Sequence, residues 1–206
     1  MADREATRKV VQDQWPPSTY LSYDDRVMTR APQTEAPVRL VPYDPSWPAL
    51  FEAERTVLEG VLRPWLAGPI EHVGSTAVPG LLAKPVIDIM APVENLDASR
   101  PAISTLVHSG WFYFPYRADV MHWLGKPSPA FRTHHLHLVP FRSPLWIERL
   151  AFRDCLRHDP AVAAEYAALK RDLAQRYEFD REAYTEAKGP FVQRVLNRTA
   201  ALTAGR

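Results

Sequence analysis

One segment, residues 72–90, constrains the fold of this chain more than any other. An apolar run ends at the small-residue turn Gly74-Ser75, and a second apolar run over residues 85–93 carries one acid, Asp88. Glycine lets backbone N–H groups approach a phosphate closely, and serine adds a hydroxyl at little steric cost. An acid in an apolar strand is expensive to bury, so it usually has a cation or a metal as partner. The segment therefore predicts two strands, a turn suited to phosphate and a carboxylate suited to a cation.

The composition indicates a single domain of ordinary size. The chain has 206 residues, of which 46% are hydrophobic, and this is enough for a sizeable core. Lysine and arginine nearly balance the acids, at 25 against 24, so nothing indicates a bulk nucleic-acid binder. No apolar run approaches the roughly 20 residues that span a bilayer, and the first residues lack the apolar core of a signal peptide. We expect a cytoplasmic protein without a membrane segment.

The single cysteine, Cys155, excludes an intramolecular disulfide and fits a reducing compartment. It lies in a stretch of helical periodicity, where a cysteine is more often a buried structural thiol than a nucleophile.

Residues 1–37 differ from the rest of the chain. They are polar, show no sustained period and contain four prolines, so we expect a flexible N-terminal extension ahead of a domain at 38–206. The alternative is an arm that docks on the domain or on a neighbouring molecule through Trp15 and Tyr20.

Within 38–206, strand-like segments alternate with helical ones and are followed by a run of helices. Ser46 is the expected N-cap of a helix over Trp47–Leu62, and Asp97 that of a helix ending at His108. The other predicted helices are Leu145–Arg157, Ala161–Arg176 and Glu182–Leu202, and the predicted strands are Val38–Val41, Pro69–Val73, Pro85–Val93, Trp111–Phe114, Val120–Leu124 and Phe131–Pro140. This order predicts an α+β (α/β-like) domain with a C-terminal helical layer.

Histidines add to the chemistry of Asp88. Alternation along a strand places His135 and His137 on one face, so these imidazoles and Asp88 would converge if their strands are neighbours. Two imidazoles and a carboxylate suit a divalent transition metal. The alternative is a set of buried polar groups bonded to the backbone or to Asp88. Three further histidines are weaker candidates, namely His72, His122 and His134.

Met90 stands two residues after Asp88, where a two-metal transferase would need a second carboxylate. Two-metal chemistry is therefore not expected. Lys84, Lys188 and Arg132 are candidate anion-binding groups, although a solvated or structural role is the simpler interpretation for the two lysines. The aromatic run Trp111–Tyr116 is expected in the core or in an edge strand, with base stacking as the alternative.

Several of these segments closely resemble the GrpB family, which is placed in the nucleotidyltransferase superfamily. The resemblance covers about Val38 to Thr199, and the segments that carry it are Val41–Pro48, His72–Gly80, Lys84–Ile89, Arg132–Leu138 and Tyr184–Lys188. It implies a nucleotidyltransferase-like mixed sheet with flanking helices. Fold alone does not fix function.

The resemblance, taken with the residues, gives the expected site. Asp88, His135 and His137 would hold a divalent metal (Mg²⁺, Mn²⁺ or Zn²⁺), with Asp88 and His137 as the catalytic pair. A nucleotide or another phosphorylated small molecule would contact Gly74, Ser75, Thr76, Lys84, Arg132 and Lys188. An active protein would transfer a nucleotidyl or phosphoryl group. The alternatives are a non-catalytic accessory or regulatory domain and a His/Asp metal-dependent hydrolase. Family members joined to dephospho-coenzyme A kinase domains suggest a partner in the coenzyme A pathway.

Overall fold

A five-stranded mixed sheet forms the centre of the molecule in a computed structural model, which describes residues 37–204. The strands are β1 (Glu71–Val73), β2 (Ile87–Val93), β3 (Phe112–Phe114), β4 (His122–Pro127) and β5 (Arg132–Pro140). Their order across the sheet is β1-β2-β5-β4-β3. Only the central pair, β2 with β5, is parallel, and the other pairs are antiparallel. The predicted mixed sheet is confirmed, whereas residues 1–36 of the expected extension lie outside the described part.

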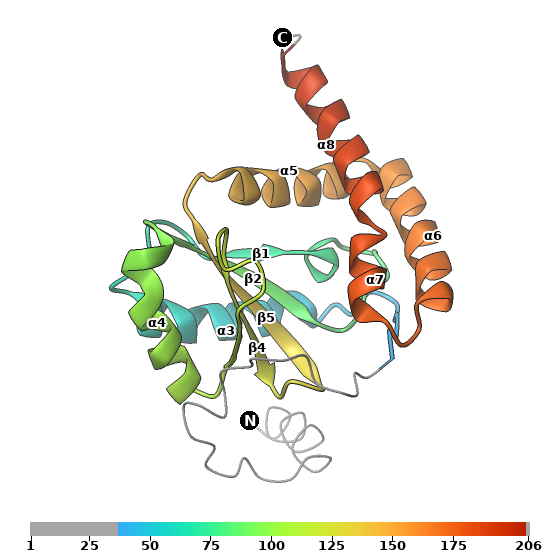
Figure 1. Ribbon diagram of the computed structural model, residues 1–206. Coiled ribbons are helices and arrows are strands. Elements are labelled where there is room, and N and C mark those ends of the chain that lie inside the picture. The colour runs from blue at the N-terminus through green and yellow to red at the C-terminus, as the bar shows by residue number, and fades with distance from the viewer. Residues whose placement is uncertain (1–36, 205–206) are drawn as a thin grey trace.

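Helices cover both faces of the sheet (Figure 1). They are α3 (Trp47–Leu62), α4 (Leu96–His108), α5 (Pro144–His158), α6 (Pro160–Arg176), α7 (Arg181–Glu186) and α8 (Gly189–Ala204). Ile87 and Ile89 of β2 and Leu136 of β5 point toward α3 and α4, where they form the largest apolar cluster with side chains of both helices. Each fully buried isoleucine or leucine contributes about 2 kcal/mol through loss of apolar surface to water.

The opposite face of the sheet is only partly apolar. Met90 and Val139 pack there against Trp146 of α5, and both are fully buried. The C-terminal helices α6 and α8 pack on α5 and on the loop of Val78 and Leu81. Because side chains alternate along a strand, Asp88 and His135 share this second face with Met90. The polar residues therefore lie under the C-terminal helical layer that the sequence predicts.

Four local predictions are corrected by the structure. Ser46 occupies the N-cap position of α3 as predicted, but its side chain makes no cap bond, and its N–H donates to Asp44 Oδ1. Asn95, rather than Asp97, caps α4 by accepting a hydrogen bond from the Ala98 N–H. Val38–Val41 is no strand, because only Val41 forms an isolated bridge, to Ala83.

The fourth correction concerns the predicted helix Glu182–Leu202, which is two helices. Helix α7 ends at Glu186 and α8 begins at Gly189, followed by Pro190 in its first turn. Proline fits the first turn of a helix but not its interior, so Pro190 fixes a second helix start. The break leaves Lys188 at the junction of the two helices.

A buried hydrogen-bond chain fixes the loop between β1 and β2. The Thr76 hydroxyl donates to the Val86 carbonyl at 3.0 Å, so it accepts from His72 Nε2 at 3.1 Å. The His72 ring must then carry its proton on Nε2, and it stacks on Phe51 at 4.7 Å between centroids. Burial is the main reason that the pKa of His72 is lowered to about 4, with nearby Arg157 and Arg153 adding to the shift. His72 is therefore neutral in the folded protein at pH 7.

No helix between residues 37 and 204 combines the length and the hydropathy required to cross a bilayer.

Acid should destabilise the protein in part through His72. The unfolded state takes up a proton on this ring near pH 6.5, and the folded state only near pH 4. The free energy of unfolding therefore keeps its full value above pH 6.5 and falls as the pH drops from 6.5 to 4. At about 1.4 kcal/mol per pKa unit, the loss attributable to His72 is on the order of 3 kcal/mol. Urea unfolding of His72→Gln at pH 7.5 and 5.0 should show a smaller pH dependence than the unsubstituted protein.

His158→Gln, at an exposed position of α5, is the control and should leave the pH dependence unchanged. If the free energy of unfolding of His72→Gln falls between pH 7.5 and 5.0 as much as that of the unsubstituted protein, this account of the loop is contradicted.

Candidate functional site

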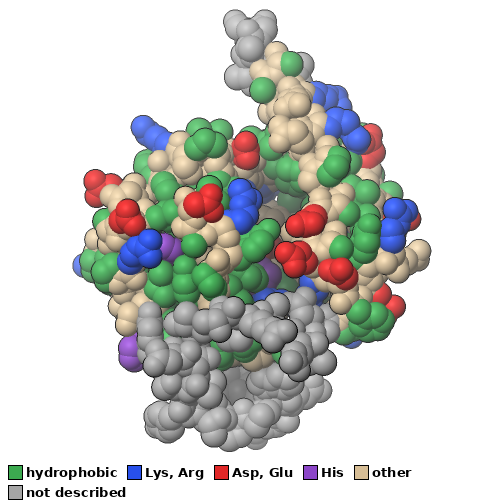
Figure 2. All heavy atoms as spheres, viewed as in Figure 1, with side chains coloured by type: hydrophobic (Ala, Val, Ile, Leu, Met, Phe, Trp, Pro, Cys, Tyr) green, Lys and Arg blue, Asp and Glu red, His purple; other side chains and the backbone are tan. Residues whose placement is uncertain are grey.

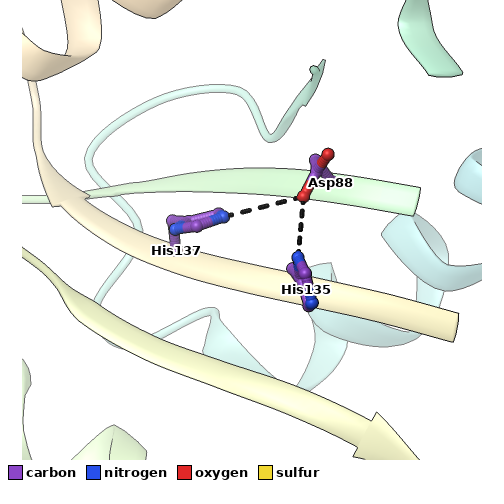
Figure 3. A group of neighbouring side chains, drawn as sticks. All are labelled: Asp88, His135 and His137. Carbon is purple, nitrogen blue, oxygen red and sulfur yellow. Dashed lines mark hydrogen bonds and ion pairs between the residues drawn. The ribbon is translucent and has the colours of Figure 1, made fainter. Parts of the chain in front are cut away.

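The parallel pairing of β2 and β5 brings the predicted acid and histidines together. Asp88 stands directly opposite His135, and the next residue on the same face of β5 is His137. His135 Nδ1 lies 3.0 Å from Asp88 Oδ1, and His137 Nε2 lies 3.9 Å from the same oxygen (Figure 3). The convergence that alternation and strand adjacency predict is therefore present in the structure.

The electrostatics of this group favour one carboxylate and two neutral imidazoles. Burial alone would raise the pKa of the Asp88 carboxyl, but its interactions with His135 and His137 hold that pKa well below the usual range. Burial also lowers the pKa of His135, against the opposing effect of Asp88. For His137, burial and then the nearby Arg149 guanidinium lower the pKa to about 3. Neutral imidazoles retain the lone pair that a metal needs.

The three side chains fit a divalent ion. One donor atom from each residue can be chosen so that all lie within 4.8 Å of one another. Donors that share an ion at bond lengths near 2.1 Å lie about 3 to 4 Å apart, so a small closure of the group would suffice. His135 Nε2 and His137 Nδ1 are buried and have no hydrogen-bond partner among the described residues.

The second carboxylate of a two-metal site is absent from β2. Met90 is fully buried in the apolar cluster with Val73, Val139 and Trp146, and it stands opposite His137 in the sheet. The position is thus part of the core rather than part of the polar group. The arrangement can serve one ion.

Gly74 makes room for Asp88. Its φ of 72° lies in the left-handed region, and a Cβ added at this position would collide with Asp88 Oδ2. The turn and the acid, which are separated by fourteen positions in the sequence, are therefore in contact. Ser75 follows as the first residue of the short 3₁₀ turn η1 (Ser75–Ala77) and is half-buried beside this carboxylate.

Lys170 of α6 contacts this turn from the C-terminal layer. Its Nζ donates to Ser75 Oγ at 3.1 Å and also to the Leu82 carbonyl. The Lys170 side chain was not expected in the site. A usable signal does exist, because Lys170 falls on the apolar stripe of α6 with Val162, Tyr166 and Leu173.

The two lysines predicted to bind a ligand meet at Tyr184. Lys84 Nζ lies 5.1 Å from the centre of this ring and Lys188 Nζ lies 4.3 Å from it. Burial lowers the pKa of Lys188 to about 7; the charge of Lys84 lowers it further and that of Asp88 opposes the shift. Lys188 and Arg149 of α5 therefore belong to the electrostatic surroundings of Asp88, and Lys84 acts on Lys188.

The remaining predicted contacts differ in their accessibility. The Arg132 guanidinium packs near the rings of Phe114 and Trp123, at 5.4 and 5.3 Å from their centres, and Trp123 in turn contacts His135 edge-on. Arg132 thus lies on the site face of the sheet but within an aromatic cluster. Thr76 is only 1% exposed, and its hydroxyl is used by His72 and Val86, so it supports the turn from inside.

The site opens to the surface. Figure 2 shows a hollow between the sheet and the C-terminal helices, with histidine and basic side chains visible at its edge. Gly74 is exposed, and Ser75, Asp88, His135 and Lys188 are half-buried. A small ligand could therefore reach the carboxylate, the imidazoles and the lysines from the same side.

Comparison with known proteins establishes the family to which this chain belongs. The profile of the family described as GrpB protein matches residues 37–198. The chain therefore belongs to the GrpB family, and its mixed sheet is consistent with the nucleotidyltransferase-like superfamily.

Individual relatives agree with this assignment. A UPF0157 protein of Pseudomonas aeruginosa is 41% identical over 172 residues, which cover 81% of this chain and 69% of that protein. The crystal structure of GrpB from Enterococcus faecalis superposes with a TM-score of 0.70 at 32% identity, covering 78% of this chain and 96% of that one. A dephospho-CoA kinase of Mycolicibacterium paratuberculosis is 33% identical over 189 residues, which cover 79% of this chain but only 46% of the kinase.

Substitution of Gly74 by alanine should damage the site through steric collision. A positive φ costs a non-glycine residue about 1–3 kcal/mol, and the added Cβ of Gly74→Ala must also displace the Asp88 carboxylate. Gly80→Ala is the matched control, because Gly80 has a φ of 77° but open space where a Cβ would lie. In denaturant unfolding, Gly74→Ala should lose about 1–3 kcal/mol more than Gly80→Ala, the usual range for overpacking. Equal losses would show that Asp88 does not confine this position.

Proposed function

We propose that this protein binds one divalent metal ion together with a nucleotide or another phosphorylated small molecule, and that it transfers a nucleotidyl or phosphoryl group. The observation that carries the proposal is the convergence of Asp88, His135 and His137 beside the Gly74-Ser75 turn. The metal would be held by the carboxylate and the two imidazoles, and the phosphate by the turn and the lysines around it.

The donor set favours a transition metal over Mg²⁺. Imidazole suits Zn²⁺ and Mn²⁺ better than it suits Mg²⁺, which prefers oxygen ligands in a strict octahedron. His137 is a poor general base, since its pKa lies at about 3. A role as metal ligand agrees better with this environment, with Asp88 as the charged ligand. When bound, the ion would supply Lewis-acid polarisation of a phosphoryl oxygen.

The phosphate half of the proposal rests on charge. Lys170 contacts the turn, Lys84 and Lys188 lie over the Tyr184 ring, and among the described residues no carboxylate lies within 4.0 Å of Lys170 or Lys188. Burial lowers the pKa of Lys170 and of Lys188 to about 7, because an ammonium group without a counter-ion is costly to bury. A phosphate that bridges Ser75 and Lys188 would stabilise the ammonium form, so an anionic ligand is better suited to the site than a neutral one.

A second candidate is a binding domain without turnover. Met90 leaves β2 with a single acid, and sequences similar to this chain occur within longer proteins named dephospho-CoA kinase. These observations favour an accessory or regulatory domain with a partner in the coenzyme A pathway. The same donor set would also serve a metal-dependent hydrolase, so metal content and ligand preference are the first properties to measure.

Zn²⁺ or Mn²⁺ should raise the thermal stability of the protein, because a ligand that binds only the folded state stabilises it by about 2.7 kcal/mol at one hundred times its Kd. Asp88→Asn and His137→Gln should each abolish the metal-induced rise in Tm. The matched controls are Asp97→Asn, at an exposed acid, and His134→Gln, on the same strand as His137 but on the opposite face. Metal stabilisation that survives in Asp88→Asn would contradict the site.

The second test concerns the anion. In the presence of the preferred metal, ATP, ADP or coenzyme A should raise the Tm and adenosine should not, because the lysines recognise phosphate and not the base. Lys188→Met should reduce the effect of the phosphorylated ligand, since its ammonium lies beside Tyr184 near the turn. Arg194→Met, which removes an exposed cation of α8, should leave the effect intact. Equal stabilisation by adenosine and ATP would count against phosphate recognition.

A further inference from the structure

Lys170 is unusual among the charged side chains of the C-terminal helices because it is almost completely buried. It is 2% exposed and lies between Tyr166 and Leu173 on the inward face of α6. Its Nζ contacts Ser75 Oγ, the Leu82 carbonyl and, at 4.8 Å from the centroid, the ring of Tyr166. An apolar side chain of similar volume would fill this space without the desolvation cost of an ammonium group. The charge is therefore expected to have a purpose beyond packing.

The hydrogen bonds of Ser75 suggest that purpose. A serine hydroxyl has one proton to donate and lone pairs that accept. The ammonium form of Lys170 can only donate, so Ser75 Oγ is the acceptor in this pair. Tyr166 also lies beside Ser75; burial raises its pKa, so it is a neutral phenol that can donate to Ser75 as well as accept from it. Because Lys170 donates to Ser75 Oγ from α6, the Ser75 hydroxyl is free to turn its proton toward a group on the cleft side.

The cleft side is where the proposed ligand would lie. Ser75 follows Gly74, which contacts the Asp88 carboxylate. Burial, and after it the nearby charge of Lys188, lowers the pKa of Lys170 to about 7. An anionic oxygen placed between the turn and Lys188 would accept a hydrogen bond from the Ser75 hydroxyl. The ammonium of Lys170 would strengthen that bond by polarising the hydroxyl.

We propose that Lys170 is a positioning residue, which orients the Ser75 hydroxyl as a hydrogen-bond donor to an anionic oxygen of the phosphorylated ligand. This inference rests on the phosphate half of the proposed function. In this role α6, part of the C-terminal helical layer, sets the direction of a hydrogen bond in the loop between β1 and β2.

A double-substitution cycle on the full chain tests this role. The probe is inorganic pyrophosphate, titrated calorimetrically with and without Mn²⁺. Lys170→Met and Ser75→Ala should each weaken pyrophosphate binding about tenfold, and the double variant should lose little more than either single variant, because both remove the same hydrogen bond. Arg171→Met, which removes the exposed neighbouring charge on α6, should change the affinity less than twofold.

Independent, multiplicative losses in the double variant would overturn the role of Lys170, and so would unaltered binding by Lys170→Met. Lys170→Gln separates orientation from charge, because glutamine can still donate to Ser75. It should bind pyrophosphate within about threefold of the unsubstituted protein if orientation is what matters. If Lys170→Met does not fold, Lys170→Gln and Ser75→Ala decide the question, and equal losses in both would contradict the proposal.

Failure of the underlying function has a different signature. An unsubstituted protein that does not bind pyrophosphate, with or without Mn²⁺, would contradict the phosphate half of the proposed function and the role of Lys170 with it. Pyrophosphate binding with independent losses would contradict the role of Lys170 alone.

Discussion

The parallel pairing of β2 with β5 is the constraint on which the rest of the site depends. The register sets Asp88 opposite His135, and one step of two residues along each strand sets Met90 opposite His137. A shift of one residue in either strand would move its polar side chains to the face covered by α3 and α4. There, Ile87, Ile89 and Leu136 form the main apolar cluster, which would have to accept a carboxylate or an imidazole. Hydrophobic packing on one face therefore holds the polar group together on the other.

Much of this arrangement could be predicted from local patterns. The period-2 alternation in 131–140 correctly separates His135 and His137 from Leu136 and Leu138, because alternation follows from strand geometry alone. Helix α3 begins and ends at the predicted residues, Trp47 and Leu62, since proline and the apolar period mark it clearly. The adjacency of β2 and β5 was only a condition in the sequence argument, because strand order depends on contacts that are distant in the chain.

The residues that sequence reasoning missed are those whose roles depend on tertiary contacts. The position of Lys170 on the apolar stripe of α6 marks it as buried, but its contact with the Gly74-Ser75 turn becomes apparent only when α6 is placed against that turn. Thr76 looks like a continuation of that turn, but the 3₁₀ geometry of η1 directs its hydroxyl inward to His72 and Val86. The break before α8, by contrast, was readable from Gly189-Pro190, and the helical period on both sides concealed it.

The charges around Asp88 link the two halves of the proposed ligand set. The Asp88 carboxylate interacts electrostatically with Lys188 and Arg149, and Lys84 and Lys170 lie close enough to Lys188 to add to the positive charge around it. A divalent cation alone would add to this excess of positive charge, and an anion alone would lie close to the Asp88 carboxylate. Each ligand therefore reduces the electrostatic penalty of the other, and linkage requires that this effect be reciprocal. The geometry thus favours joint binding of a metal and a phosphate over binding of either one alone, and it explains why a site with a single acid can still suit a highly charged ligand.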